Sequence, residues 1–316
     1  MQGSDRDRVE RTLRDVLGGA EITGLERLTG GASRQTWTAD VGDRRVVAQR
    51  QAAGSEQEMR VEAAVLRAAH AEGVPTPRVI DCVEGDDGVV TLVTDFVGGE
   101  TIARRILRDA EFATARAVLV EQLGRAMARI HRIPTDAVAG LEPVAELELY
   151  RDRLDEIGEP HPTFELAVRW LADHRTDVGA ERAVVVHGDL RLGNVIVDHG
   201  GLAAVIDWEL AHLGNPLQDL GWACVPAWRF GSELPAAGIG TRDALLSAYN
   251  DEAGTGFFVD DLRWWEVYGI LRWGVMCVTQ ADRHLSGTTR SHELAAIGRR
   301  VCENEHDLFL ALEGRW

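Results

Sequence analysis

The sequence contains no lysine, because all 34 of its lysine-plus-arginine positions are arginines. Any mechanism that needs a lysine amine is therefore excluded, and a cationic grip on a ligand must come from arginine or from backbone amides. Cysteine is also scarce: Cys82, Cys224, Cys277 and Cys302 stand far apart and form no C-x-x-C pair. This spacing provides no zinc or redox motif and predicts reduced, buried thiols in a cytoplasmic protein.

Excess basic charge and long apolar runs are missing as well. Acidic residues outnumber arginines by 51 to 34, a net charge of −17, so we expect neither a nucleic-acid partner nor an anionic membrane. No apolar run approaches the ~20 residues of a membrane span, and the charged first residues are unlike a signal peptide. The chain does have 316 residues with 45% hydrophobic content, which is enough for one large domain or two lobes with a shared cleft.

The first part of the chain predicts a β-rich lobe. Its expected elements are a helix at 5–17, three strands within 22–51, a helix at 55–72 and two strands within 73–97. Turns are expected at Gly30-Gly31 and at Gly42-Asp43, and Ser55 is the expected N-cap of the second helix.

The remainder predicts a mainly helical lobe behind a glycine-containing connector, "DFVGGE" (95–100). Expected helices cover 112–132, 144–175 (one or two helices), 216–225, 241–251, 260–280 and 290–312, with short strands at 183–186, 194–198 and 203–206. The fold class is thus α+β, with a small antiparallel β lobe (1–97) and a larger, mainly helical lobe (98–316). A cleft between such lobes is a favoured place for ligands.

The stretch "VHGDLRLGNVIVDHGGLAAVIDWE" (186–209) carries the densest chemistry. Asp189 follows one predicted strand, Asn194 opens the next and Asp207 ends the third, so their oxygens converge at one end of the strands. Such hard oxygens suit Mg²⁺, and two Asp with an Asn are the working set for phosphoryl transfer. Asp189 would take the proton of an acceptor hydroxyl, Asn194 and Asp207 would hold the metal, and His187 would orient the loop. Any one of these residues alone is equally typical of a turn.

The same stretch resembles the aminoglycoside phosphotransferase family, bacterial relatives of protein kinases, whose signature is H-G-D-x-x-x-x-N followed by I-D-[WF]. "HGDLRLGN" and "IDWE" carry the likeness, which extends from about residue 22 to the C-terminus. "DWELAHLGNPLQDLGW", "LRWGVM" and "IGRRVCENEHDL" are most similar to the kinase-like domain of certain acyl-CoA dehydrogenases. The resemblance implies a bilobal protein-kinase-like fold and an ATP- or GTP-dependent, Mg²⁺-dependent transfer of the γ-phosphate to a small-molecule hydroxyl.

The resemblance also implies a nucleotide site. The loop "LTGGAS" (28–33) would cover the phosphates with the backbone around Gly30, Gly31 and Ser33, although these residues alone equally fit a hairpin turn. Glu62 matches the helix carboxylate that pairs with a strand lysine in kinases, and Asp219 matches a carboxylate that braces the catalytic loop. The base would be recognised by the Asp95 carbonyl and the Val97 amide, and held between Ala48, Ile196 and Ile206.

The third strand, "RRVVAQRQ", departs from the family pattern because it has no lysine. Alignment on the usual V-A-x-K places Gln49 at the lysine position, with Arg50 next. Side chains alternate along a strand, so only one of the two faces the cleft, and Arg50 would need a local bulge to do so. A guanidinium there could bind phosphate bidentately. The sequence leaves Gln49, Arg50 and backbone amides open as the phosphate grip.

Three classes of function compete. The first is a kinase of a small-molecule hydroxyl, for which the subgroup likeness favours a hydroxyacyl or lipid-like acceptor over an aminoglycoside or macrolide. The second is a nucleotide-binding pseudokinase, although the presence of Asp189, Asn194 and Asp207 together favours activity. The third is a metal-dependent hydrolase that uses His187, Asp189, Asp207 and His212.

The acceptor site and the quaternary state are less constrained. Aromatic and arginine side chains of the helical part could form an apolar acceptor pocket with a cation for a carboxylate or phosphate, and each tryptophan also fits the core. The candidates are Trp222, Trp228, Arg229, Phe230, Arg272 and Trp273. The oligomeric state is not predicted by any feature of the sequence.

Overall fold

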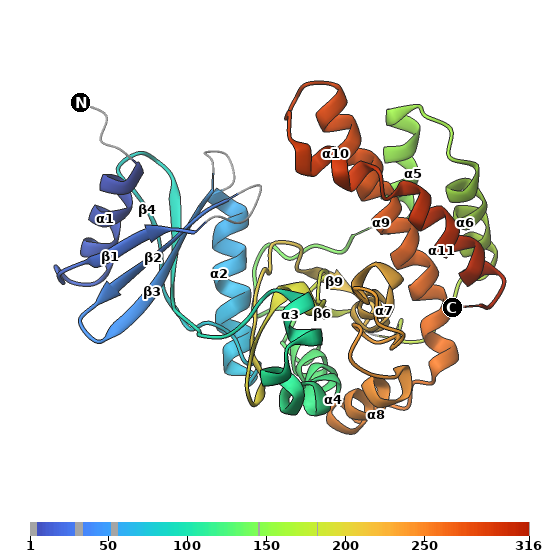
Figure 1. Ribbon diagram of the computed structural model, residues 1–316, viewed down its shortest axis with the longest axis horizontal. Coiled ribbons are helices and arrows are strands. Elements are labelled where there is room, and N and C mark those ends of the chain that lie inside the picture. The colour runs from blue at the N-terminus through green and yellow to red at the C-terminus, as the bar shows by residue number, and fades with distance from the viewer. Residues whose placement is uncertain (1–4, 29–33, 52–55, 145, 182, 316) are drawn as a thin grey trace.

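The computed structural model describes residues 5–28, 34–51, 56–144, 146–181 and 183–315. Five antiparallel strands near the N-terminus form one sheet, and most of the later chain is helical (Figure 1). This arrangement confirms the predicted α+β fold with a small β lobe and a larger helical lobe. The expected turn at Gly30-Gly31 and the expected N-cap Ser55 lie outside the described residues.

The sheet contains all five predicted strands. They are β1 (Thr23–Arg27), β2 (Arg34–Val41), β3 (Arg44–Gln51), β4 (Val79–Glu84) and β5 (Val90–Asp95), in the spatial order β1-β2-β3-β5-β4. Helix α1 (Asp5–Val16) packs on one face, and helix α2 (Glu56–Ala71) contacts β4 and β5. The sheet therefore has one face covered by α1 and another that faces α2 and the rest of the molecule.

Side-chain alternation decides what each face of β2 and β3 carries. Trp37 and Ala48 are directly opposite each other in the antiparallel register and pack into the core beneath α1. Thr36 and Gln49 are the adjacent pair and point to the other face, where they line a cleft. Because the period of a strand is two, a residue one position away from a cleft residue belongs to the α1 core.

The helical lobe contains the predicted helices with some changes of boundary. Its elements are α3 (Ala103–Arg108), α4 (Ala113–Ile130), α5 (Glu146–Ile157), α6 (Pro162–Asp173), β6 (Val184–Val186), β7 (Val195–Asp198), β8 (Gly201–Val205), β9 (His212–Gly214), α7 (Leu217–Cys224), α8 (Arg242–Ala253), α9 (Leu262–Leu285), α10 (His292–Gly298) and α11 (Val301–Leu312). Helix α9 lies against α7, α10 and α11 and thus forms the centre of this lobe. None of the helices in the described ranges is long and apolar enough to span a membrane.

One expectation for the helical lobe was wrong, and two short elements were not predicted. The single helix predicted over 290–312 is divided into α10 and α11, and Gly298 at the break leaves no room for a β-carbon against Ala281 of α9. The short helix α3 and the strand β9 were not anticipated, because six and three residues are too few to show a clear periodicity. β9 pairs with β6 and adds a strand beneath the catalytic stretch.

The connector between the lobes packs on β7. Glu100 and Val197 exchange two backbone hydrogen bonds of 2.8 and 3.0 Å, which form an isolated antiparallel bridge. Gly99 has φ +147°, and a β-carbon there would collide with Ile196. The close approach that glycine permits brings β7 beneath the connector and directs Ile196 towards the cleft.

Candidate active site

Asp189 is held by three side-chain donors. Its Oδ2 accepts a 2.6 Å hydrogen bond from Nδ2 of Asn194, and its Oδ1 accepts bonds of 2.8 Å from Nε1 of Trp222 and 3.2 Å from Nε of Arg191. The Asn194 amide also donates to the Asp189 backbone carbonyl at 2.9 Å. These bonds fix the direction of a carboxylate that is only partly buried. The predicted proximity of Asp189 and Asn194 is therefore present.

The residues before Asp189 give the loop its shape. His187 is fully buried, its Nε2 donates to the Ile206 carbonyl at 3.1 Å, and its Nδ1 accepts from the Asp189 N–H at 3.2 Å. Gly188 has φ +80°, and a β-carbon there would overlap the Leu210 carbonyl. A left-handed backbone with a crowded neighbour requires glycine. His187 thus orients the loop, as expected, through both of its ring nitrogens.

Asp219, on α7, braces the same loop from below. Its carboxylate is completely buried and accepts backbone N–H bonds from His187 (2.7 Å) and Gly188 (2.9 Å). Nε2 of His131 donates to it at 3.1 Å, and Nδ1 of His131 lies 2.9 Å from the Tyr249 hydroxyl. Burial alone would raise the pKa of Asp219, but His131 and the loop amides hold it at about 2. The carboxylate is therefore a charged, rigid support for the loop.

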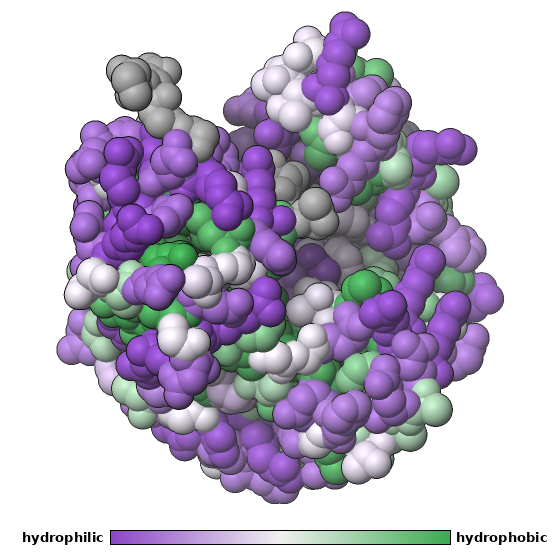
Figure 2. All heavy atoms as spheres, turned by 60° about the vertical axis from the view of Figure 1, so that its left-hand side comes forward, coloured by the Kyte–Doolittle hydropathy of each residue, from purple (hydrophilic) through white to green (hydrophobic). Residues whose placement is uncertain are grey.

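A cleft of about 890 Å³ opens between the two lobes. Figure 2 shows the corresponding hollow between the two masses of the molecule, towards the top of that view. The predicted nucleotide and metal residues that line the cleft are Gln49, Glu62, Asp95, Val97, Ile196, Ile206 and Asp207. The structure thus gathers residues of the β lobe, the connector and the catalytic stretch around one space, as the bilobal prediction requires.

Two predicted nucleotide residues do not face this cleft. Ala48 lies in the core between the sheet and α1, so Val47 of the same strand lines the cleft instead. Arg50 is 5% exposed on the α1 side, where its Nη2 donates to Oδ2 of Asp87 at 2.6 Å. β3 has no bulge in its pairing with β2, so of the two alternatives left open Gln49 faces the cleft and Arg50 does not. Ala48 is on the same face as Arg50, so its placement against the base was wrong.

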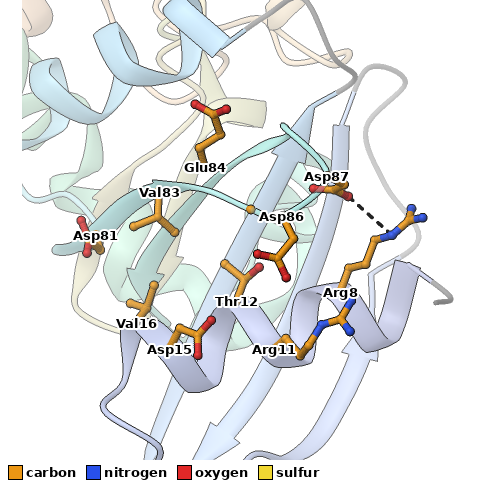
Figure 3. A pocket seen from close by; sticks show the side chains of 11 residues that line it. Arg8, Arg11, Thr12, Asp15, Val16, Asp81, Val83, Glu84, Asp86 and Asp87 are labelled. Carbon is orange, nitrogen blue, oxygen red and sulfur yellow. Dashed lines mark ion pairs between the residues drawn. The ribbon is translucent and has the colours of Figure 1, made fainter. Parts of the chain in front are cut away.

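Figure 3 shows the surroundings of Asp87, the partner of Arg50. Arg8 of α1 also approaches Asp87, with Nε 3.6 Å from Oδ2, as the dashed line marks. A hollow of about 430 Å³ lies here, between α1 and the turn after β4, and contains none of the predicted nucleotide residues. Asp87 thus links Arg8 of α1 to Arg50 of β3 and helps to hold the helix against the sheet. Of the other predicted nucleotide residues, Gly30, Gly31 and Ser33 lie outside the described ranges.

Asp207 and Asn194 form an oxygen-rich corner. The N–H of Ile206 donates to the Asn194 backbone carbonyl at 3.0 Å, which ties the residue before Asp207 to Asn194. Asp207 is exposed and has φ +66°, an uncommon conformation for a residue with a side chain. Strained backbone of this kind concentrates at functional sites.

The charges around this corner fit a divalent cation. Burial raises the pKa of Glu62 and that of Glu209, and the negative charge of Asp207 raises both further. The side-chain nitrogen of Asn194 donates a hydrogen bond to Asp189. The atom of this side chain that could bind a metal is therefore its carbonyl oxygen, which suits Mg²⁺. Asn194 and Asp207 therefore carry oxygen atoms of the kind that bind Mg²⁺, with Asn194 buried and Asp207 lining the cleft.

Arg34 is a cleft residue that the sequence reading missed. It begins β2, its Nη1 lies 2.5 Å from Oε2 of Glu62, and its Nη2 lies 3.2 Å from Oε2 of Glu209. Glu62 therefore has the cationic partner that the resemblance implied, but on β2 instead of β3. The apolar alternation of Trp37 and Ala39 was a signal, because it places Arg34 on the opposite, cleft-facing side.

The predicted acceptor residues divide into two groups. Trp222, Trp228 and Trp273 form a chain of ring contacts, with centroid distances of 5.1 and 4.9 Å, that begins at the Trp222 bond to Asp189. The Arg272 guanidinium carbon lies 4.4 Å from the Trp222 ring centroid, within cation–π distance. Arg229 instead donates to the Cys224 carbonyl, and Phe230 lines a separate hollow with Leu107 and Arg108.

Arg191, also unanticipated, joins the first group. Its guanidinium carbon lies 4.7 Å from the Trp228 ring centroid, and its Nε bonds Asp189. Arg191 and Trp222 thus both bond Oδ1 of Asp189, and Trp228 contacts these two residues. The position of Arg191 two residues after Asp189 could have predicted this contact, because residues so close in a short loop lie near each other.

The hydrolase alternative does not fit this geometry. Both ring nitrogens of His187 are used within the loop, and His212 lies within 2.8 Å of the Leu210 carbonyl and 3.1 Å of the Gln218 amide oxygen. Throughout the part of the chain that the structure covers, no three His, Cys, Asp or Glu side chains are grouped as a metal site. The histidines support the loops and are not presented to a zinc ion.

Similarity to curated proteins falls into two groups. The mouse acyl-CoA dehydrogenase family member 10 is 27% identical over 255 residues, which are 73% of this chain and 23% of that protein. The aminoglycoside 3′-phosphotransferase of Escherichia coli is 30% identical over 144 residues, 42% of this chain and 52% of that protein. The chain thus spans about a quarter and about half of the lengths of these relatives.

Solved structures share the fold at low identity. A crystal structure assigned to the aminoglycoside phosphotransferases, from Ralstonia eutropha JMP134, has a TM-score of 0.78 at 21% identity and covers 98% of both chains. The macrolide 2′-phosphotransferase of Brachybacterium faecium has a TM-score of 0.64 at 17% identity, over 90% of this chain and 96% of that one. These likenesses confirm the kinase-like fold.

The family itself is shown by a longer match. The sequence pattern of the phosphotransferase enzyme family covers residues 24–258, which include almost all of the sheet, most of the cleft residues and the stretch 186–209. The suspected resemblance is thereby confirmed over most of the chain. The chain therefore belongs to the phosphotransferase enzyme family, enzymes that transfer a phosphoryl group.

Proposed function

We propose that the chain is an ATP- or GTP-dependent small-molecule kinase in which Asp189 is the general base. The observation that carries the proposal is the Asp189 carboxylate, held by Asn194 and Trp222 at 2.6 and 2.8 Å, in the same stretch of chain as Asp207, which lines the interlobe cleft. A carboxylate fixed in this way can orient an acceptor hydroxyl and accept its proton as the oxygen attacks phosphorus. The buried Asp219 brace keeps the loop rigid, so the acceptor oxygen and the γ-phosphate can be held in line.

The nucleotide base is proposed to lie at the connector. The Asp95 carbonyl and the Val97 amide would recognise its edge, and Ile196 and Ile206 would pack against its ring. Solved relatives that share the fold bind GDP, in aminoglycoside 2′-phosphotransferase-IIIa, and ADP, in spectinomycin phosphotransferase. The proposed boundary between a nucleotide lobe (1–97) and a catalytic lobe (98–316) falls between β5 and α3.

Asn194 and Asp207 are proposed to hold Mg²⁺. When bound, the ion would neutralise phosphate charge and so permit a triphosphate to enter a corner that already contains several carboxylates. Without compensation, Asp207 and its acidic neighbours would repel the nucleotide.

We expect Asp207→Asn to lower the Mg²⁺-dependent part of nucleotide affinity by about 10- to 100-fold or more, because a charged oxygen ligand is lost. Asparagine tolerates the left-handed backbone at this position, so the loop should keep its shape. Titration calorimetry with ATP and GTP, with and without Mg²⁺, measures the effect. The exposed Asp251→Asn on α8 is the matched control, and an unchanged Mg²⁺ dependence in Asp207→Asn would contradict the assignment.

The acceptor is proposed to be a hydroxyl compound with apolar or anionic groups, such as a hydroxyacyl thioester or a hydroxylipid. Arg191 bonds Asp189 and is 25% exposed, and a guanidinium beside the carboxylate suits acceptor carboxylates or phosphates better than the ammonium groups of an aminoglycoside. Trp222 and Trp228 are buried behind it. The similarity to acyl-CoA dehydrogenase family member 10 supports the same class.

We expect hydroxyacyl-CoA or hydroxylipid acceptors to give the highest kcat/KM in a coupled ADP- or GDP-release screen. The screen should also contain aminoglycosides, macrolides, choline-like alcohols and sugars. A preference for aminoglycosides or macrolides would overturn the acceptor class while the kinase assignment stands. Tight nucleotide binding without turnover on any acceptor or on water would instead identify a pseudokinase.

A further inference from the structure

The cation that would bind the nucleotide phosphates is not on β3, because that strand places no charged side chain in the cleft. Gln49 faces the cleft but carries no charge, and Arg50 is committed to Asp87 on the opposite face. Among the cleft-lining residues in the described ranges, the cations are Arg34 and Arg283. Arg283 is exposed near the end of α9, whereas Arg34 is 8% exposed beside Glu62.

Arg34 has the features of a positioned ligand-binding cation. Glu62 fixes Nη1 from the buried side and is itself 3% exposed, so this ion pair forms a rigid anchor. The second partner, Glu209, is 37% exposed, so its contact with Nη2 is the one that solvent or a ligand can replace. Nε of Arg34 is buried without a hydrogen-bond partner. A buried guanidinium nitrogen without an acceptor is costly, and a ligand oxygen would satisfy it.

We infer that Arg34, anchored by Glu62, is the residue that grips the nucleotide phosphates in place of the absent β3 lysine. The inference rests on the proposed function and adds to it the source of the cation. Arg34 begins β2 and lines the cleft together with Glu62, Asp207 and Glu209. Its planar group can meet two phosphate oxygens at once.

The test compares nucleotides that differ only in their phosphates. Titration calorimetry in the presence of Mg²⁺ measures Kd for the nucleoside, its mono- and diphosphate and a non-hydrolysable triphosphate analogue, in whichever base series binds the wild-type chain. We expect Arg34→Gln to weaken triphosphate-analogue binding by about 10- to 100-fold and nucleoside binding by less than about twofold. Arg34→Lys should lose less than about tenfold, because it keeps the charge beside Glu62.

Arg50→Gln is the matched control, since it removes an arginine of similar burial from the same sheet but from the α1 face. Its melting temperature should fall, because the partly buried ion pair between Arg50 and Asp87 is lost, whereas its nucleotide affinities should remain within about twofold of wild type. Circular dichroism of each variant shows that the sheet is intact. If Arg34→Gln does not fold, the same titrations on Arg34→Lys, which keeps a charge beside Glu62, test the inference through the difference between triphosphate and nucleoside binding.

Rescue from β3 gives a test that loss of stability cannot imitate. Gln49 lies on the same face as Arg34 and also lines the cleft, so a lysine there restores the usual strand position. In the Arg34→Gln background, Gln49→Lys should recover at least about tenfold of the lost triphosphate affinity without changing nucleoside affinity. Equal losses for nucleoside and triphosphate analogue in Arg34→Gln, or no loss at all, would overturn the inference.

The experiments distinguish failure of the proposed kinase function from failure of the role given to Arg34. If the wild-type chain binds none of the nucleotides, the proposed function fails and the role of Arg34 fails with it. If the wild-type chain binds and turns over nucleotide but Arg34→Gln binds the triphosphate analogue equally well, only the inference about Arg34 fails.

Discussion

Asp189→Asn is expected to lower kcat for phosphoryl transfer by about 10²- to 10⁴-fold while nucleotide Kd stays within about twofold of wild type. The substituted amide keeps the shape of the side chain but cannot accept the acceptor's proton. Asp189 also does not line the nucleotide cleft, so the affinity should survive. Steady-state kinetics with the best acceptor from the screen, together with nucleotide calorimetry, separates these two quantities.

Controls for this prediction come from the same loop and from the surface. Asp189→Ala should be as inactive as Asp189→Asn, because both lack the base. The exposed Asp173→Asn, at the end of α6, should retain wild-type kcat. Turnover by Asp189→Asn at more than about a tenth of the wild-type rate would exclude Asp189 as the base.

Asp219→Ala is expected to lower the free energy of unfolding by about 3–5 kcal/mol, the range for breaking one side of a buried charged network. The change leaves the His187 and Gly188 amides and Nε2 of His131 without their acceptor in a fully buried place. Activity should also fall, since the loop that carries Asp189 loses its support. Urea unfolding followed by tryptophan fluorescence gives the stability difference.

The same carboxylate predicts a pH dependence. Folding lowers the pKa of Asp219 from 3.8 to about 2, so its stabilisation is present above the unfolded value and is lost as pH falls towards the folded value. The difference in urea midpoint between wild type and Asp219→Asn should therefore be constant above about pH 5 and narrow towards about pH 3. A difference that grows on acidification would contradict the charged brace.

The catalytic stretch was readable from the sequence because its parts are close along the chain. Asp189 and Asn194 are joined by a single short loop, and Asp207 follows a two-stranded hairpin of β7 and β8. Local hydrogen bonds of this kind bring near neighbours together whatever surrounds them. The order of helices and strands was readable for the same reason, since hydrophobic period is a local property.

The residues of β3 that line the proposed nucleotide cleft could be predicted only in part, because the packing of the sheet decides which face of the strand meets the cleft. The sequence shows that Gln49 and Arg50 point in opposite directions but does not show which side α1 covers. Because α1 packs against Trp37 and Ala48, these residues belong to the core under α1, and Ala48 cannot contact the nucleotide base. Arg50 is on the same face as Ala48 and pairs there with Asp87. A single choice of covered face thus decided two residues together.

Contacts between distant residues were decided by the tertiary structure alone. Arg34 reaches Glu62 across 28 positions, and Trp222 reaches Asp189 across 33. Neither contact can be predicted from a hydrophobic period in the sequence, because each depends on how α2 or α7 lies against a strand or loop from another part of the chain. The absence of lysine and the spacing of Asp189, Asn194 and Asp207 specified a phosphoryl-transfer site in need of another cation. Only the tertiary structure, in which α2 packs on β4 and β5 of the same sheet, brings Glu62 of α2 to Arg34 of β2.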